Sequence, residues 1–234
     1  MLGKKPASTR IPFSYQVHSE ETGAASSLAS QLAEQLDKVP SYRDIVVVCI
    51  GTDRSTGDSL GPIIGSSLEK SSLKRLCVYG TLAKPVHAVN LEETIEMIQR
   101  YHHRPFIVAI DACLGRVKNV GKINFSEGPV IPGAAMKKKL PHVGEMHVTG
   151  IVNVSGMMEY FVLQNTRLYT VMAIADCISQ GFILADNKLK FPSSSITKNN
   201  VSQTPVHTKG LSKTESAFSL QQIHHKESPP IDES

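Results

Sequence analysis

Two apolar runs that each lead to an aspartate constrain the fold of this chain more than any other feature. The first run covers residues 46–50 and leads to Asp53 and Asp58, and the second covers 106–110 and leads to Asp111. Unbroken apolar, β-branched runs are typical of parallel strands that are buried on both faces. In open α/β sheets, ligands bind at the loops that leave the carboxyl ends of such strands. The pattern therefore predicts an α/β fold with carboxylates gathered at one edge of the sheet.

Strand-like and helix-like segments alternate along the first half of the chain. Leucines at an i, i+4, i+8 spacing predict a helix over 24–36, and Asn90 followed by two glutamates predicts a capped helix start. Alternation of this kind predicts right-handed crossovers and a mostly parallel sheet. The predicted strands are 44–50, 76–79, 106–110, 120–125 and 146–149, and the predicted helices are 24–36, 60–68, 90–101, 154–163 and 168–182.

Composition divides the chain into three parts. Residues 1–20 are polar with isolated aromatic residues and are predicted to form an N-terminal arm that lies across the surface or is flexible. Residues 21–186 carry most of the predicted strands and helices and form the α/β domain. Residues 187–234 are rich in Ser, Thr, Lys, His, Asn and Pro. Because this last segment has only single apolar residues, it cannot bury enough surface to offset its ordering entropy, and a disordered polar tail is predicted.

The totals for the chain argue against several classes of function. A hydrophobic content of 41% and a charged content of 20% over 234 residues are typical of a soluble globular protein. The net charge of +4 is mild, and no basic stripe with interleaved aromatics is present, so nucleic-acid binding is not expected. Four widely spaced cysteines without a C-x-x-C pair indicate a reducing compartment. No secretory signal and no stretch near about 18 apolar residues is found. We expect a cytoplasmic protein that does not contact a membrane.

Asp58 and Asp111 are the strongest candidates for chemistry. A carboxylate at the end of a buried strand is costly unless it is hydrogen-bonded, paired or metal-bound. Two neighbouring carboxylates cannot both ionise freely, so the pair would supply an acid and a base that activate water on a carbonyl. The same pair with a histidine would instead bind a divalent metal ion. In the simpler alternative, Asp58 caps the helix at 60–68 and Asp111 caps the turn after its strand.

His87 and His147 are the next candidates, because both lie in loop-like stretches beside predicted strands. Each is equally compatible with a structural histidine. The loop at 51–57 has neither a Gly-Lys-Ser/Thr nor a G-x-G-x-x-G pattern, so a nucleotide site is not expected. No G-x-S-x-G elbow is present, which argues against a serine nucleophile.

Several long motifs resemble the YyaC family, a group of sporulation proteins described as spore proteases of endospore-forming Firmicutes. The motifs lie at 45–62, 78–82, 86–91, 110–116 and 150–156, and the resemblance runs from about residue 8 to residue 186. More distantly, Gly-Asp-Ser-Leu-Gly-Pro at 57–62 and Ile-Asp-Ala at 110–112 are similar to motifs of two other groups. These are the germination protease, which degrades small acid-soluble spore proteins, and the nickel-recognising hydrogenase maturation endopeptidases.

The resemblance implies a three-layer α/β sandwich with a mostly parallel sheet, of the phosphorylase/hydrolase-like kind found in hydrogenase maturation proteases. It implies that Asp58 and Asp111 are catalytic, because they match the carboxylates of the germination protease. In the maturation proteases, acidic residues at matching positions contact a metal together with a later histidine. The resemblance therefore also implies a nickel or zinc ion held by Asp58, Asp111 and His147, with His87 as the other histidine available.

These observations predict a sporulation-associated endopeptidase in which Asp58 and Asp111 activate water to hydrolyse a peptide bond of a spore protein. Asp53 or His87 would support the pair, and nearby glycines would let a substrate backbone approach closely. The alternatives are a non-catalytic peptide- or metal-binding protein on the same fold, and a self-processing zymogen with the N-terminal arm as its pro-segment. The predicted substrate-binding residues are Gly51, Asp53, Gly57, Gly61 and His87.

Overall fold

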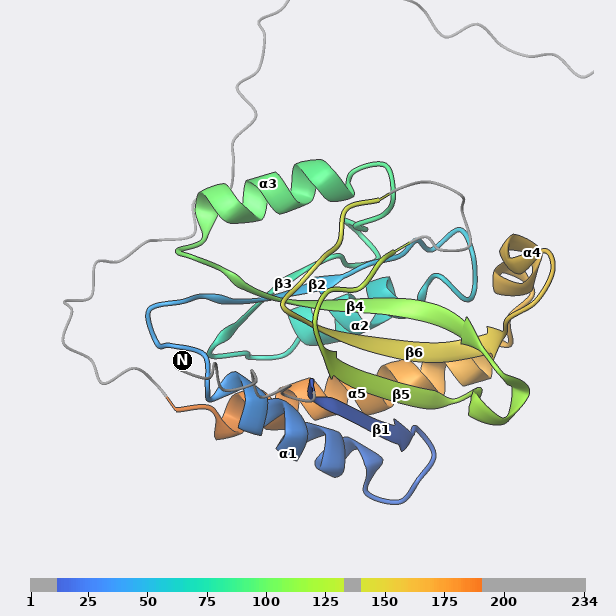
Figure 1. The fold of residues 1–234 in the computed structure, drawn as a ribbon, viewed down its shortest axis with the longest axis horizontal. Helices are drawn as coiled ribbons and strands as arrows, with labels where there is room; N and C mark the ends of the chain where they lie inside the picture. Colours follow the sequence, from blue (N-terminus) through green and yellow to red (C-terminus); the bar gives the residue numbers. More distant parts are fainter. Residues whose placement is uncertain (1–11, 133–139, 191–234) are drawn as a thin grey trace, which may run out of the picture. The chain divides into compact units, whose positions relative to one another are not determined.

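The computed structural model describes residues 12–132 and 140–190, which contain a six-stranded sheet and its flanking helices (Figure 1). The strands are β1 (Ser14–His18), β2 (Ile45–Cys49), β3 (Leu76–Tyr79), β4 (Phe106–Gly115), β5 (Lys122–Glu127) and β6 (Met146–Val154). The α-helices are α1 (Ala24–Leu36), α2 (Leu60–Glu69), α3 (Leu91–Tyr101), α4 (Glu159–Gln164) and α5 (Leu168–Lys188). Most of the predicted tail lies outside the described residues, and α5 includes its first two.

The sheet is parallel through its middle and antiparallel at one side. Its strand order is β1-β5-β6-β4-β2-β3. β2 pairs in parallel with both β3 and β4, and β4 pairs in parallel with β6. β5 is antiparallel to β6, and β1 is antiparallel to β5. The prediction of an α/β fold with a mostly parallel sheet is therefore confirmed, and two antiparallel pairings extend it at one edge.

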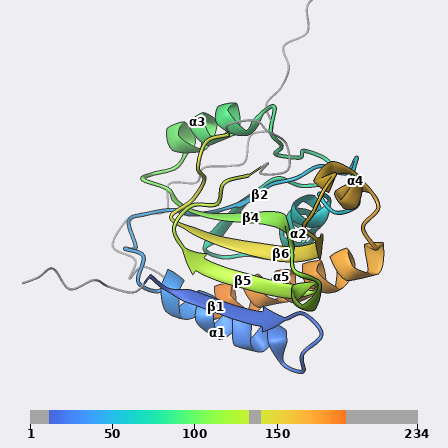
Figure 2. The same ribbon diagram turned by 45° about the vertical axis from the view of Figure 1, so that its right-hand side comes forward.

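Helices pack on both faces of this sheet. α1, α2 and α5 lie on one face and α3 lies on the other (Figures 1 and 2). All five residues of β2 are buried, as its unbroken apolar run predicts. Its side chains alternate between the two cores, because Val47 belongs to the cluster shared with α1, α2 and α5, and Val46 to the cluster beneath α3.

α3 covers only part of its face of the sheet. The apolar cluster beneath it contains residues of β2 and β4 but none of β1, β5 or β6. On those three strands the side chains of this face are largely polar, and they include Gln16, Asn124 and Thr149. No helix of the described residues lies over them in either view (Figures 1 and 2). This polar part of the face lies beside the region that α3 covers, with Gln16 exposed, Asn124 half-buried and Thr149 buried.

Four sequence predictions about these elements are wrong. The predicted helix at 154–163 starts too early, because pairing with β4 keeps β6 extended through Val154 and α4 begins only at Glu159. The predicted strands at 106–110 and 146–149 are too short, because β4 continues to Gly115 and β6 continues to Val154. Part of the predicted N-terminal arm is the edge strand β1, which the ladder with β5 holds in the sheet. Residues 1–11 of that arm lie outside the described part.

α5 is the central helix of the larger core. By length and composition alone it is apolar enough to cross a membrane, contrary to the expectation that no stretch of the chain is. Half of its most apolar stretch is buried within the structure, where it packs against α1 and α2. Fully buried α5 residues such as Ile178 and Phe182 belong to the main core cluster. This burial accounts for the apolar character of α5 without a membrane.

Candidate active site

Asp58 lies in the loop that joins β2 to α2, and this loop folds back onto the end of the strand. The Thr52 amide donates a hydrogen bond to the Asp58 carbonyl at 3.1 Å. Gly51 adopts a φ of +147°, and a Cβ added there would collide with the same carbonyl. The folded loop therefore needs a glycine at this point, and it places Asp58 close to the carboxyl end of β2.

The other glycines of the loop also pack against the protein itself. A Cβ at Gly57 would lie 2.7 Å from Cδ2 of Leu163 in α4, and a Cβ at Gly61 would collide with the Ile50 carbonyl. The Gly57 amide donates to the Leu163 carbonyl at 2.9 Å. These glycines therefore have a packing role, and a substrate backbone at Gly51, Gly57 and Gly61 stays a prediction. The backbone that approaches these glycines is the chain's own.

Asp58 is not the cap of the helix that follows it. The N-cap residue of α2 is Ser59, and its hydroxyl donates to the Thr56 carbonyl at 2.7 Å rather than capping the helix. Burial raises the pKa of the Asp58 carboxyl, and the Ser55 hydroxyl opposes that rise. Ser55 Oγ is itself buried, and among the described residues it makes no hydrogen bond of standard distance and angle. The capping alternative for Asp58 is therefore excluded.

Asp111 lies one residue beyond the point where β4 stops pairing with β2. Burial raises the pKa of Asp111 to about 8. The Ala112 amide, which donates to its Oδ1 at 2.9 Å, opposes this rise, and the negative charge of Asp58 adds to it. The sequence thus brings the two predicted carboxyls into one electrostatically coupled region. At neutral pH Asp111 holds its proton and can act as an acid.

Cys113 and Thr149 adjoin Asp111, and neither was predicted to belong to the site. Thr149 of β6 is the register partner of Asp111, and Cys113 follows two residues later along β4. Burial raises the pKa of Cys113 to about 11, a hydrogen bond with Thr149 lowers it, and the charge of Asp111 raises it. The thiol therefore stays protonated at neutral pH and is poorly suited to be a nucleophile. The i, i+2 spacing of Asp111 and Cys113 was the available sequence signal.

The structure places His87 beside the loop of Asp58. The Gly51 amide donates to the Val86 carbonyl at 2.8 Å, and His87 is the next residue. The His87 amide donates to Oδ1 of Asn90 at 2.8 Å, so the Asn90 side chain holds the backbone at His87 in place. Asn90 is the N-cap residue of α3, but its side chain makes no cap hydrogen bond, which corrects the predicted capping. Asp53 lies in the same loop as Asp58, between β2 and α2, and is exposed.

His147 does not complete a metal centre with the two aspartates. Its Nδ1 lies 2.8 Å from the Gly128 carbonyl oxygen, at hydrogen-bond distance. Within residues 12–132 and 140–190, no group of three or more His, Cys, Asp or Glu side chains is arranged to hold a metal ion. The residues present therefore do not fit the nickel or zinc site that was predicted at Asp58, Asp111 and His147.

An exposed apolar surface borders the candidate site on the side of α4. Tyr160 and Phe161 are about half exposed, and Met157 is 91% exposed. α4 is joined to the loop of Asp58 by the hydrogen bond between Gly57 and Leu163. Methionine and aromatic side chains are common on surfaces that bind peptides. The coupled carboxyls thus lie next to a surface suited to contact a polypeptide.

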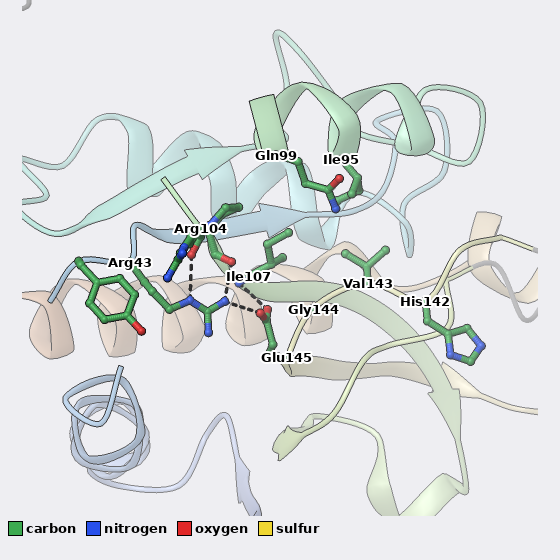
Figure 3. Close-up of a pocket in the computed structure, with 11 residues that line it drawn as sticks. Arg43, Ile95, Gln99, Arg104, Ile107, His142, Val143, Gly144 and Glu145 are labelled. Carbon is green, nitrogen blue, oxygen red and sulfur yellow. Dashed lines mark hydrogen bonds and ion pairs between the residues drawn. The ribbon is translucent and has the colours of Figure 1, made fainter. Parts of the chain in front are cut away.

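A cavity of about 600 Å³ lies at the opposite, amino end of the parallel strands (Figure 3). Arg43 is its central group, and its guanidinium donates to the carbonyls of Arg104 and Pro105 and to the Glu145 carboxylate. The Glu145 carboxylate also accepts the Ile107 amide at 2.8 Å. These bonds join three segments of chain. The predicted site residues do not line this cavity, so the arginine network has a structural role there.

The fold and the two carboxyls define an α/β protein with a pair of aspartates at the carboxyl edge of a mostly parallel sheet. The chain belongs to the family described as "Protein of unknown function (DUF1256)", which matches residues 16–181. It is 54% identical over 166 residues to "Uncharacterized protein YyaC" of Bacillus subtilis (strain 168), covering 71% of this chain and 80% of that protein. The resemblance to YyaC is therefore confirmed, and the matched family range contains Asp58 and Asp111.

Proposed function

We propose that this protein is an endopeptidase that hydrolyses a peptide bond of a spore protein with Asp58 and Asp111. The observation that carries the proposal is Asp111, whose pKa is raised to about 8 by burial first and, to a smaller extent, by the charge of Asp58. Pairs of carboxyls in different protonation states are the usual source of a general acid and a general base at neutral pH. Asp111, whose pKa of about 8 keeps it protonated at neutral pH, takes the acid role, and Asp58 takes the base role.

The reaction divides between the two residues as follows. Asp58 accepts a proton from water while the water oxygen attacks the scissile carbonyl carbon, and Asp111 donates its proton to the carbonyl oxygen. In the collapse of the tetrahedral intermediate, Asp58 passes its proton to the leaving nitrogen as the C–N bond breaks. Asp111 then recovers a proton from the hydroxyl group. The products are one carboxylic acid and one amine, and both aspartates return to their starting states. No step passes through a metal ion, because the donor set does not fit one.

The arrangement of helices supports the fold that the family resemblance implies. α3 lies on one face of the sheet and α1, α2 and α5 lie on the other, as in a three-layer sandwich (Figure 1). The motifs at 57–62 and 110–112 that resemble the germination protease contain the two coupled aspartates. We extend this resemblance to a phosphorylase/hydrolase-like fold, to a spore protein as substrate and to the cytoplasm of a sporulating cell. We also propose that the protein binds neither nucleic acid nor a membrane.

Incubation of the full chain with purified small acid-soluble spore proteins tests the proposal. Mass spectrometry of the products should show new peptide termini. Asp58→Asn and Asp111→Asn should each reduce the cleavage rate about a thousandfold, because each removes one of the two proton-transfer groups. Asp176→Asn, at an exposed position of α5, is the matched control and should leave the rate unchanged.

Correctly folded Asp58→Asn and Asp111→Asn proteins that cleave at the wild-type rate would contradict the proposal. A wild-type protein that binds the spore proteins without cutting them would favour the second candidate, a non-catalytic peptide-binding protein. The exposed methionine and aromatic residues beside the site favour that candidate, because such a surface binds a polypeptide without any chemistry.

A further inference from the structure

The register of the sheet places Asp111 at the end of a row of polar side chains. Asp111 on β4 is paired with Thr149 on β6, and Thr149 is paired with Asn124 on β5. Asn124 is in turn paired with Gln16 on the edge strand β1. Because register partners share a face of the sheet, the four side chains form one line across four strands. We call these residues, Gln16, Asn124, Thr149 and Asp111, the cross-strand row.

Hydrogen bonds connect three members of this row, Gln16, Asn124 and Thr149, in one direction. Nε2 of Gln16 donates to Oδ1 of Asn124 at 2.6 Å, and Nδ2 of Asn124 donates to Oγ1 of Thr149 at 3.3 Å. Nζ of Lys122 donates to Oε1 of Gln16 at 3.0 Å, which fixes the outer end. The side chains are therefore held in defined orientations rather than moving freely on the surface.

The two amides keep hydrogen-bonding capacity for a ligand. In the bonds described, Gln16 and Asn124 each use one amide N–H and one lone pair of the carbonyl oxygen. A primary amide has two N–H groups and two lone pairs, so one of each remains on both residues. This combination of one donor and one acceptor matches the N–H and C=O groups of a peptide backbone.

The row lies on the face of the sheet that no described helix covers. Gln16 is exposed, Asn124 is half-buried and Thr149 is buried, so access narrows from the edge strand toward Asp111. β1 is the last strand of the sheet, so no further strand of the described residues blocks the outer end of the row. A chain lying along the row can therefore continue past the edge, as a site for internal peptide bonds requires.

We propose that the cross-strand row binds the backbone of an extended polypeptide and leads it to the Asp58–Asp111 pair. Four neighbouring strands span about 14 Å, which is the length of about four residues of extended chain. The hydrogen bonds contact backbone groups, so the row selects for an extended conformation rather than for particular side chains. This proposal rests on the proposed function, whose peptide substrate it describes.

A binding titration that does not depend on cleavage tests the row. The full chain carrying Asp58→Asn is titrated against fluorescein-labelled, reduced and carboxymethylated κ-casein, an unfolded polypeptide, and fluorescence polarisation reports the Kd. Adding Gln16→Ala should raise the Kd about 3- to 10-fold, the usual effect of losing one neutral hydrogen bond. Adding Asn124→Ala as well should raise it about 10- to 100-fold in total.

The matched control is the double variant Ser14→Ala/Ser126→Ala. These serines lie on the same two strands and on the same face of the sheet as Gln16 and Asn124, one row away. Their hydroxyl oxygens lie 3.1 Å apart. The control should leave the Kd within about twofold of its parent, since its row does not lead to Asp111. Circular dichroism confirms that each variant is folded, and Gln16→Ala, at an exposed edge position, provides a variant with little effect on folding.

The outcomes separate this proposal from the proposed function. An unchanged Kd in the folded Gln16/Asn124 double variant, an equal weakening in the serine control, or no casein binding by the parent below 100 μM would each overturn the row proposal. Loss of affinity for maltoheptaose but not for casein would assign the row to sugars and also overturn it. Row-dependent casein binding by a wild-type protein that cuts no peptide bond would overturn the endopeptidase alone.

Discussion

Asp186 and Asp111 are both largely removed from solvent, but the two carboxyl groups have different hydrogen-bond partners. Asp186, near the end of α5, is 2% exposed, and its carboxylate accepts three backbone N–H groups at 2.7 to 3.2 Å. Asp111 accepts the amide of its own neighbour Ala112 and lies in the field of a second carboxyl. The donors to Asp186 are Lys74, Arg75 and Leu76.

The contrast distinguishes a structural carboxylate from a candidate functional one. At Asp186 the carboxyl group accepts three backbone N–H groups, so the residue joins α5 to the start of β3. At Asp111 burial and a neighbouring charge favour the neutral form, at a cost to the folded state near neutral pH. Burial of an aspartate therefore carries little information until the donors around it are known.

Asp186→Ala should have the largest effect on stability. It leaves three N–H groups near the start of β3 without their acceptor, and we expect a loss of about 3–5 kcal/mol in the free energy of unfolding. Urea unfolding followed by circular dichroism measures this loss. Asp176→Ala is the control at an exposed position of the same helix. Equal unfolding midpoints for the two variants would remove the contrast between Asp186 and Asp111.

Gly61→Ala tests whether the backbone of the candidate site is as tightly packed as the contacts indicate. The added methyl group would collide with the Ile50 carbonyl, so we expect a loss of about 3 kcal/mol from overpacking. Gly156→Ala is the matched control, because a Cβ there has nothing within 4 Å. Thermal unfolding of both variants gives the comparison, and a tolerated Gly61→Ala would show that the loop is free to shift.

Asp111→Asn should stabilise the protein, in contrast to Asp186→Ala. The unfolded carboxyl has a pKa near 3.8 and the folded one a pKa of about 8, so between these values only the unfolded state releases its proton. The stability of the wild type should therefore fall as pH rises from about 4 to 8 and then level off. We expect the variant to be more stable by on the order of 2 kcal/mol at pH 8.

Urea midpoints at pH 4, 6 and 8 measure this difference. The gap between the variant and the wild type should widen with each step of pH. A gap that narrows as pH rises would show that the folded protein stabilises Asp111 as a carboxylate.

Arg43→Lys should have the smallest effect. A lysine ammonium cannot reproduce the fork of bonds to the Arg104 and Pro105 carbonyls and the Glu145 carboxylate, and we expect a loss of about 1 kcal/mol. Because this network lies at the amino ends of the strands, cleavage by the two aspartates should be unchanged. Thermal unfolding and the spore-protein assay measure the two quantities. A change in cleavage rate without a loss of stability would show that the arginine network influences the aspartates at the other end of the sheet.

The elements with strong local patterns were predictable from the sequence. The helix 24–36 has the predicted bounds of α1, and the strand 76–79 is β3. β2 and α2 differ from prediction by one or two residues at their ends. In these segments apolar periodicity and burial agree, so no distant contact is needed to define the element.

The second half of the chain was less predictable because tertiary pairing decides its structure. The stretch that includes Gly150 and Asn153 has a weak strand propensity, and it is extended because β4 pairs with it. Asp111 was placed after its strand because aspartate is rare within strands. In the structure β4 continues to pair with β6 where β2 has ended, and this exposes one side of Asp111 to the loop of Asp58.

The same reasoning explains which parts of the candidate site were found. Asp58 and Asp111 follow apolar runs, so pattern alone identified them. The cross-strand row could not be found in this way, because Gln16 and Asn124 are more than 100 residues apart in sequence and only strand register aligns them. Cross-strand register depends on the whole sheet and leaves no local signal.

The central claim is that Asp58 and Asp111 form a coupled pair in which Asp111 is protonated at neutral pH. A ¹³C NMR titration of the Asp111 carboxyl carbon from pH 3 to pH 10, in the wild type and in Asp58→Asn, measures this directly. The account predicts a midpoint near pH 8 in the wild type, moving to lower pH when the charge at Asp58 is removed. A wild-type midpoint near the ordinary value for aspartate, or one that Asp58→Asn leaves unchanged, would contradict it.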